Sequence, residues 1–169
     1  LLEIGGSHAH LLRPLIEHLG LVTLVITDLD SAESTGHHPS KQPERGKNLI
    51  TRNATLKTWL PVKEQIDDLL DSQDSAKIRQ YDNFASVRVA YQFPVSIQIS
   101  DSLNEEALSN TFEDALIFEN LSIFKVMAGE GMVKEFRVAI EQQKTAASLG
   151  QEMFKILKDG KKAEFALEL

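Results

Sequence analysis

Leu24-Val25-Ile26-Thr27-Asp28-Leu29-Asp30-Ser31 is a run of apolar and β-branched residues that ends in two carboxylates spaced i, i+2. A run of this composition predicts a strand. In an open α/β sheet, ligand sites lie beyond the carboxyl ends of the strands, which is where Asp28 and Asp30 would then stand. Two carboxylates so close repel each other and raise each other's pKa, so a divalent cation such as Mg²⁺ is their natural partner. The stretch therefore predicts a metal site.

The residues before this stretch predict a β-α-β unit. Residues 1–3 read as the end of a strand, residues 9–19 carry the i, i+3, i+4 apolar stripe of an amphipathic helix, and residues 21–27 form the second strand. A right-handed crossover makes the two strands parallel. We therefore expect Glu3 at the same sheet edge as the two aspartates.

The rest of the chain predicts a mainly parallel sheet flanked by helices, an α/β fold with a helical insertion or subdomain around residues 120–158. Residues 32–52 are rich in Gly, His, Pro, Ser and Lys and predict a long, exposed, mobile loop. Further elements are expected as a helix opened by Pro61, strands at 87–91 and 95–99, and helices at 104–118, 132–149 and 151–157; the segment 163–169 is left open between helix and strand.

Composition excludes several classes of protein. The 169 residues contain no cysteine, which excludes disulfides, thiolate zinc sites and cysteine nucleophiles and fits a cytoplasmic protein. No apolar run approaches the ~20 residues that cross a bilayer, so no membrane association is expected. The formal charge of −7 argues against a protein that coats nucleic acid by bulk electrostatics. The chain begins without Met inside an apolar segment and is expected to be part of a longer protein.

Three further groups of residues could carry chemistry, and each also has an ordinary structural explanation. Glu3 before Gly5 and Gly6 could be an edge carboxylate before a turn. In Thr111-Phe112-Glu113-Asp114, the two acidic residues could lie on the solvated face of a helix that buries Phe112 on its other side. Lys161 and Lys162 could be a solvated basic pair.

The order of these groups resembles the Toprim region of OLD-family (overcoming lysogenization defect) nucleases. The resemblance rests on Leu2-Glu3-Ile4-Gly5-Gly6, Thr27-Asp28-Leu29-Asp30-Ser31, Thr111-Phe112-Glu113-Asp114-Ala115 and Lys162-Ala163-Glu164-Phe165-Ala166, and it covers essentially the whole of residues 1–169. It implies a Toprim nuclease domain that hydrolyses the phosphodiester bonds of DNA with two metal ions, Mg²⁺ or Mn²⁺.

The resemblance also implies roles for residues and partners. Glu3, Asp28 and Asp30 match the acidic ligands, Glu113 with Thr111 matches the Ser/Thr-Phe-Glu segment, and Lys162 matches the family lysine. Glu3, Asp28 and Lys162 are then the expected catalytic residues. In the family an ABC-type ATPase region precedes the Toprim part, so ATP would act only through that missing region. A homodimer and possible action with a helicase-like partner are part of the same expectation.

The sequence departs from the family pattern at one position. Relatives often carry a second Glu about four residues after the first, where this chain has Ser7, His8 and His10. Imidazole suits Mn²⁺, Co²⁺ or Zn²⁺ better than Mg²⁺, so His8 is a candidate ligand of a second, softer ion. The alternative is that both histidines only begin a helix.

Two other functions remain open. Residues 25–30 also look like the first motif of haloacid-dehalogenase-type phosphatases, in which Asp28 would be the nucleophile. Those enzymes need a later acidic pair at a strand end, and the chain offers only Asp67-Asp68 within an expected helix. The second alternative is a weakly active Toprim scaffold that couples the ATPase to a partner.

Overall fold

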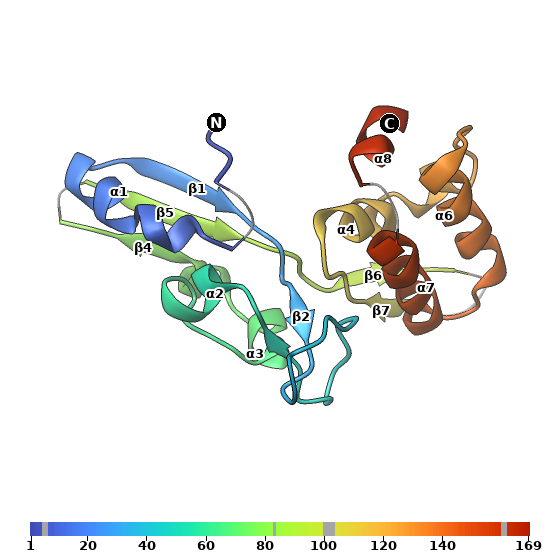
Figure 1. Ribbon diagram of the computed structural model, residues 1–169, viewed down its shortest axis with the longest axis horizontal. Coiled ribbons are helices and arrows are strands. Elements are labelled where there is room, and N and C mark those ends of the chain that lie inside the picture. The colour runs from blue at the N-terminus through green and yellow to red at the C-terminus, as the bar shows by residue number, and fades with distance from the viewer. Residues whose placement is uncertain (5–6, 83, 100–103, 160–161) are drawn as a thin grey trace. The chain divides into compact units, whose positions relative to one another are not determined.

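The computed structural model describes residues 1–4, 7–82, 84–99, 104–159 and 162–169. The chain divides into two compact units, Leu1–Gln92 and Phe93–Leu169. Helices and strands occur in both units (Figure 1), so the expected α/β composition is confirmed. The expected helical segment, residues 120–158, supplies most of the helices of the second unit.

The first unit is built around a three-stranded sheet of order β1-β5-β4 (Figure 1). β1 (Val22–Ile26) runs parallel to β5 (Ser86–Ala90), and β5 runs antiparallel to β4 (Ile78–Gln80). The sheet is therefore mixed and small, which differs from the mainly parallel sheet that we expected. The reason is the short return from β4 to β5, closed by the Tyr81 N–H donating to Ala85 O, because so short a connection can join only antiparallel strands.

The start of the chain is partly as expected. The helix is confirmed, as a 3₁₀ turn η1 (Ala9–Leu12) that continues into α1 (Arg13–Leu19) and ends at Gly20 in the left-handed region, φ 65°. The expected strand at residues 1–3 is wrong, since these exposed residues are in no strand. A strand exists only through ladder partners, and in the described part of the chain β1 pairs with β5 alone.

A short antiparallel ribbon follows the aspartates. β2 (Ser31–Ala32) pairs with β3 (Ile50–Thr51), so both ends of the expected loop 32–52 are tied together. Within that segment Gln42 and Pro43 are buried, and the Gly46 N–H donates to Asp67. The segment is thus less exposed than expected, and its mobility stays a prediction.

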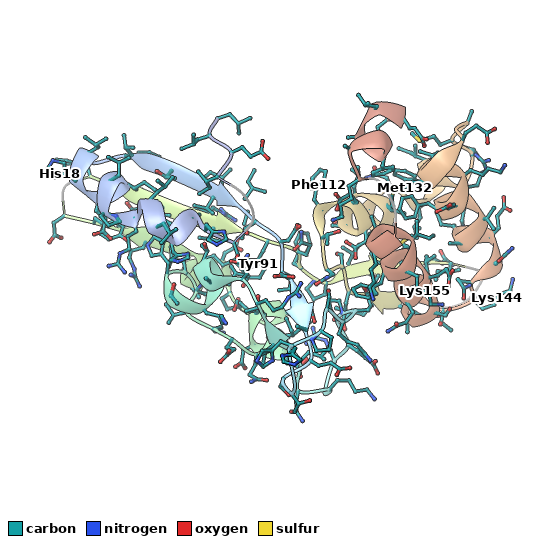
Figure 2. The ribbon with its side chains drawn as sticks, viewed as in Figure 1. His18, Tyr91, Phe112, Met132, Lys144 and Lys155 are labelled. Atoms are coloured by element: carbon teal, nitrogen blue, oxygen red, sulfur yellow. The ribbon has the colours of Figure 1, made fainter. Side chains whose placement is uncertain are left out.

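Three short helical segments complete the first unit. They are α2 (Ala54–Thr58), α3 (Ile66–Leu70) and η2 (Asp74–Lys77). The largest buried side chains of α2, of the residue that caps its C-terminus, of α3 and of the sheet are Leu56, Trp59, Ile66, Leu69, Val87 and Val89. Tyr91 follows β5 (Figure 2). It donates its hydroxyl to Leu69 O at 3.0 Å, and this bond ties the sheet to α3.

The second unit packs helices around a two-stranded antiparallel ribbon, β6 (Val95–Ile97) and β7 (Glu105–Ala107). Its helices are α4 (Phe112–Glu119), α5 (Leu121–Phe124), α6 (Gly131–Gln142), α7 (Ala146–Asp159) and α8 (Lys162–Glu168). The helix expected over residues 104–118 is therefore a strand followed by a helix. The segment 163–169, whose sequence allows helix or strand, is helical as far as Glu168.

The boundary between α6 and α7 also differs from the sequence prediction. The break falls at residues 143–145, whereas Gly150 lies buried inside α7. The Thr145 hydroxyl accepts the Ser148 N–H at 3.1 Å, and the Glu105 carboxylate accepts the Ala146 N–H at 2.8 Å. These bonds satisfy N–H groups that the first turn of a helix leaves unpaired, so α7 begins there.

The buried face of α4 is not the one we expected. Phe112 is exposed (Figure 2), whereas the buried stripe is Asp114, Ile117, Phe118 and, in the next helix, Leu121. The stripe keeps the i, i+3, i+4, i+7 spacing but starts with a carboxylate. Asp114 can be buried because its oxygens accept the backbone N–H groups of Asn110 and Thr111, both at 2.8 Å.

No helix in the described part of the chain is long and apolar enough to cross a membrane.

We predict that α8 depends on one aromatic anchor. The Phe165 ring is 2% exposed and lies 5.3 Å from the Phe136 ring, edge to face. Phe165→Ala should lower the free energy of unfolding by ~3–5 kcal/mol through lost burial and a cavity. Leu167→Ala, on the exposed side of the same helix, should change it by less than ~0.5 kcal/mol. Chemical denaturation measures both, and equal effects would contradict the anchor.

Candidate functional site

The carboxyl end of β1 holds Asp28 beside an amide from the neighbouring strand. β1 and β5 are paired through Ile26 and Ala90, and the Thr27 N–H donates to Ala90 O at 3.0 Å. Two residues further along this parallel register, Gln92 Nε2 donates to Asp28 Oδ1 at 2.9 Å. The same amide accepts the Leu29 N–H at 2.6 Å, which fixes its orientation with the NH₂ group toward Asp28. Asp28 is thereby held as a hydrogen-bond acceptor.

The backbone at Asp28 is fixed by Asn53. This side chain is 1% exposed, and its Nδ2 donates to Asp28 O and to Thr27 Oγ1, both at 2.7 Å. Its Oδ1 accepts the Thr55 N–H at 3.0 Å, which caps the start of α2. One buried amide therefore joins the end of β1 to the start of α2.

Asp30 is paired with a cation of its own unit. Arg52 Nη2 and Nε donate to the same oxygen, Asp30 Oδ1, at 2.6 and 3.2 Å. The Arg52 N–H also donates to Asp30 O at 2.9 Å, which extends the β2–β3 pairing. Asp30 has φ 50°, in the left-handed region. The carboxylate is thus oriented by a guanidinium on one side of a short ribbon.

The structure does not bring Glu3 or the histidines into a group with the two aspartates. Among the described residues, no three His, Asp or Glu side chains lie close enough together to hold a metal ion. His8 is exposed, and its ring stacks on that of His10 at 6.4 Å. The His10 N–H donates to Thr55 Oγ1 at 3.2 Å, a bond that anchors η1 on α2. Metal binding by Glu3 and His8 therefore stays a prediction.

The donors at the end of β1 nevertheless fit a divalent cation in kind. Asp28 and Asp30 offer hard carboxylate oxygens, and Mg²⁺ is commonly held by one or two carboxylates, with waters and substrate phosphates completing its shell. The first unit thus offers two carboxylates whose chemistry suits such a cation. Arg52 uses one of the two Asp30 oxygens, so a cation bound by Asp30 would stand close to the positive guanidinium of Arg52.

The second unit brings together two residues of the expected site. Lys162 Nζ, at the start of α8, donates to Glu113 Oε2 at 2.9 Å, although the two residues are 49 positions apart in the sequence. The Glu113 side chain is 17% exposed and that of Lys162 is 41% exposed. Burial raises the pKa of the Glu113 carboxyl. Hydrogen bonds from Lys162 and Thr111 lower this pKa and outweigh the effect of burial, so that the pKa of Glu113 lies below its ordinary value.

The structure gives Thr111 a role that the sequence did not indicate. Thr111 is the residue before α4, and its N–H and hydroxyl both donate to Asp114 Oδ1, at 2.8 and 3.1 Å. These bonds fix the first turn of α4 and so the direction of Glu113. A role of Thr111 as a metal ligand stays a prediction.

α8 is fixed at two points beyond Lys162. Phe165 is buried against the aromatic rings of α5 and α6, and Glu168 accepts the Val133 N–H at 3.2 Å, at the start of α6. Phe165 therefore packs inward, whereas Ala166 is exposed. Lys161, Gly5 and Gly6 lie outside the described residues.

Comparisons with protein-family models, curated proteins and solved structures find no match to this chain. The resemblance to OLD-family nucleases therefore rests on the motifs alone.

Three residues of the site were not singled out from the sequence. Gln92 and Asn53 bond to Asp28, and Arg52 bonds to Asp30. Knowledge of the register between β1 and β5 would have identified Gln92, because Gln92 lies as far beyond Ala90 as Asp28 lies beyond Ile26. No local pattern marks the other two, because their partners are more than twenty residues away.

We predict that Gln92 contributes to stability through the bond to Leu29. Gln92→Leu leaves a buried N–H without its acceptor and should lower the free energy of unfolding by ~1–3 kcal/mol. Gln80→Leu, at an exposed position of β4, is the matched control and should have little effect. Urea denaturation compares the two variants, and equal losses would contradict the assignment.

A second prediction follows from the pKa of Glu113. A carboxyl whose pKa is lowered by folding stabilises the protein above its unfolded pKa, and this contribution disappears as the pH falls through the folded pKa. The wild-type chain should therefore be more stable than Glu113→Gln at pH 7, and the difference should shrink below about pH 4.5, the ordinary value. Denaturation from pH 7 to 3 tests this. Glu119→Gln, exposed on the same helix, is the matched control and should change the stability little at pH 7.

Proposed function

We propose that this chain is a metal-dependent DNA endonuclease of the Toprim type, related to OLD-family nucleases. One observation supports this most strongly. Glu113 and Lys162, which match two separate motifs of the family, lie in direct contact at 2.9 Å. Such a contact is expected if both residues serve one site, and nothing in their spacing of 49 residues would otherwise favour it.

The first unit supports the proposal independently. Asp28 and Asp30 follow directly from a strand that pairs in parallel with its neighbour, the position at which α/β folds bind ligands. Asp28 and Asp30 would hold a divalent cation, with Glu3 and His8 as further candidates. A divalent cation bound there would activate a water molecule and stabilise the leaving oxygen, as two-metal nucleases do.

The residues of the chain would then divide the remaining tasks. Gln92 and Asn53 orient Asp28 through its side chain and its backbone. Lys162 is a point charge fixed through α8, and it would neutralise charge that gathers on the phosphate oxygens in the transition state. Glu113 holds the Lys162 ammonium in place through their hydrogen bond.

The phosphatase alternative has less support. It needs an acidic pair at a strand end, whereas Asp67 and Asp68 lie in the first turn of α3. Asp67 there accepts the Gly46 N–H at 3.0 Å, a structural bond. The proposal carries with it the family partners, which are an ABC-type ATPase region of the same protein, a homodimer and a helicase-like protein.

Plasmid cleavage tests the proposal. The chain should nick or cut DNA with Mg²⁺ or Mn²⁺ and lose this activity with a chelator. Asp28→Asn should abolish cleavage, and Lys162→Ala should lower its rate by ~10²-fold or more with little loss of DNA binding, because the charge acts in the transition state.

Lys158→Ala, at an exposed position of α7, is the matched control and should cleave like the parent. Lys161→Ala should alter mainly the salt dependence of binding. Cleavage that survives Asp28→Asn would refute the proposal. Absence of cleavage with any metal would favour the scaffold alternative, and an aspartyl-phosphate trapped at Asp28 would favour the phosphatase.

A further inference from the structure

We propose that Arg52 is a phosphate-binding residue, which exchanges its bond to Asp30 for a phosphodiester group of DNA when Asp30 binds a divalent cation. The inference rests on the proposed nuclease function and adds to it a residue that contacts the substrate. It follows from the geometry of the Arg52–Asp30 pair, from its exposure and from the backbone around it.

The Arg52–Asp30 pair does not have the geometry of the strongest bonds between a guanidinium and a carboxylate. Nη2 and Nε of Arg52 converge on the single oxygen Asp30 Oδ1, at 2.6 and 3.2 Å. The strongest arrangement uses two parallel bonds to two oxygens of a carboxylate or a phosphate. A phosphodiester presents two such non-bridging oxygens, so it can offer Arg52 the arrangement that Asp30 does not provide here.

The pair is exposed enough to exchange. The side chains of Arg52 and Asp30 are 43% and 31% exposed, so water and ions reach both. Ion pairs at such positions contribute little to stability, because solvent screens them and both side chains lose freedom. Replacing each partner by another ion of the same sign therefore costs little.

The fold around the pair does not depend on the ion pair. The Arg52 N–H donates to Asp30 O, Thr51 pairs with Ser31, and the Thr51 hydroxyl donates to Leu29 O at 2.6 Å. The next residue, Asn53, is buried and caps α2. The backbone of Arg52 is thus fixed on both sides, while its side chain can turn from Asp30 to a ligand.

The charges balance in the exchange. A cation bound by Asp30 would repel the guanidinium of Arg52, because both are positively charged, and would so weaken the bond between Arg52 and Asp30. The phosphate that would accept Arg52 is the group that the proposed reaction brings to the same place. Arg52 and the cation therefore compete for Asp30 in the absence of DNA and cooperate in its presence.

Two measurements on purified protein test this without using cleavage. The first is the affinity for Mn²⁺ alone, measured by calorimetry or electron paramagnetic resonance. Arg52→Ala should bind Mn²⁺ several-fold more tightly than the parent, because a competing cation has been removed. Asp30→Asn should bind it more weakly.

The second measurement is binding of a short DNA duplex with Ca²⁺ at several salt concentrations. Arg52→Ala should bind about ten-fold more weakly, and the slope of log K against log salt should fall by about one, as expected when one phosphate contact is lost. Arg52→Lys should restore part of the affinity, because it keeps the charge without the fork.

Arg45→Ala is the matched control, since Arg45 forms a similar exposed pair with Asp71 at 2.9 Å. It should change neither measurement. If Arg52→Ala behaves like Arg45→Ala in both, the pair is only a surface salt bridge and the inference is wrong, while the nuclease proposal stands. If the parent binds no Mn²⁺ that Asp28→Asn removes, the proposed function fails and the inference fails with it.

Discussion

The buried amide of Asn53 is the interaction on which the first unit depends. Through Nδ2 it holds the backbone of Asp28 and the hydroxyl of Thr27, and through Oδ1 it caps α2. A side chain that is 1% exposed can make these bonds only if strand and helix meet in one relative placement, because each unmet bond would be costly in the interior. The position of Asp28 is therefore set by the packing of the unit and not by a flexible loop end.

The second unit fixes its charged pair by a different means. Lys162 and Glu113 are surface-accessible to some degree, but each stands at the beginning of a helix that is anchored elsewhere. α4 is anchored by the buried carboxylate of Asp114, and α8 by Phe165 among aromatic rings. In each unit, then, an acidic residue is paired with a cation from the same unit, Asp30 with Arg52 and Glu113 with Lys162.

Local patterns predicted the parts of the fold that depend on local chemistry. The β-branched run at residues 22–26 gave a strand, and the apolar stripe before Gly20 gave a helix. The errors lie where long-range pairing decides. Residues 1–3 have the composition of a strand, but no described strand pairs with them, and the direction of β4 follows from its antiparallel pairing with β5. At α4 the buried stripe begins with Asp114. Its hydropathy predicts an exposed residue, but its hydrogen bonds to the backbone before α4 allow it to be buried.

The left-handed backbone of Asp30 decides how substitutions at that position must be read. Aspartate, asparagine and glycine adopt φ 50° at little cost, whereas other residues pay roughly 1–2 kcal/mol for the contact of Cβ with the neighbouring carbonyl. An alanine at this position removes a charge and strains the ribbon at once, so its effect on activity cannot be assigned to the carboxylate. Asparagine removes the charge without the strain and so separates the two effects. Few residue types are therefore compatible with this position.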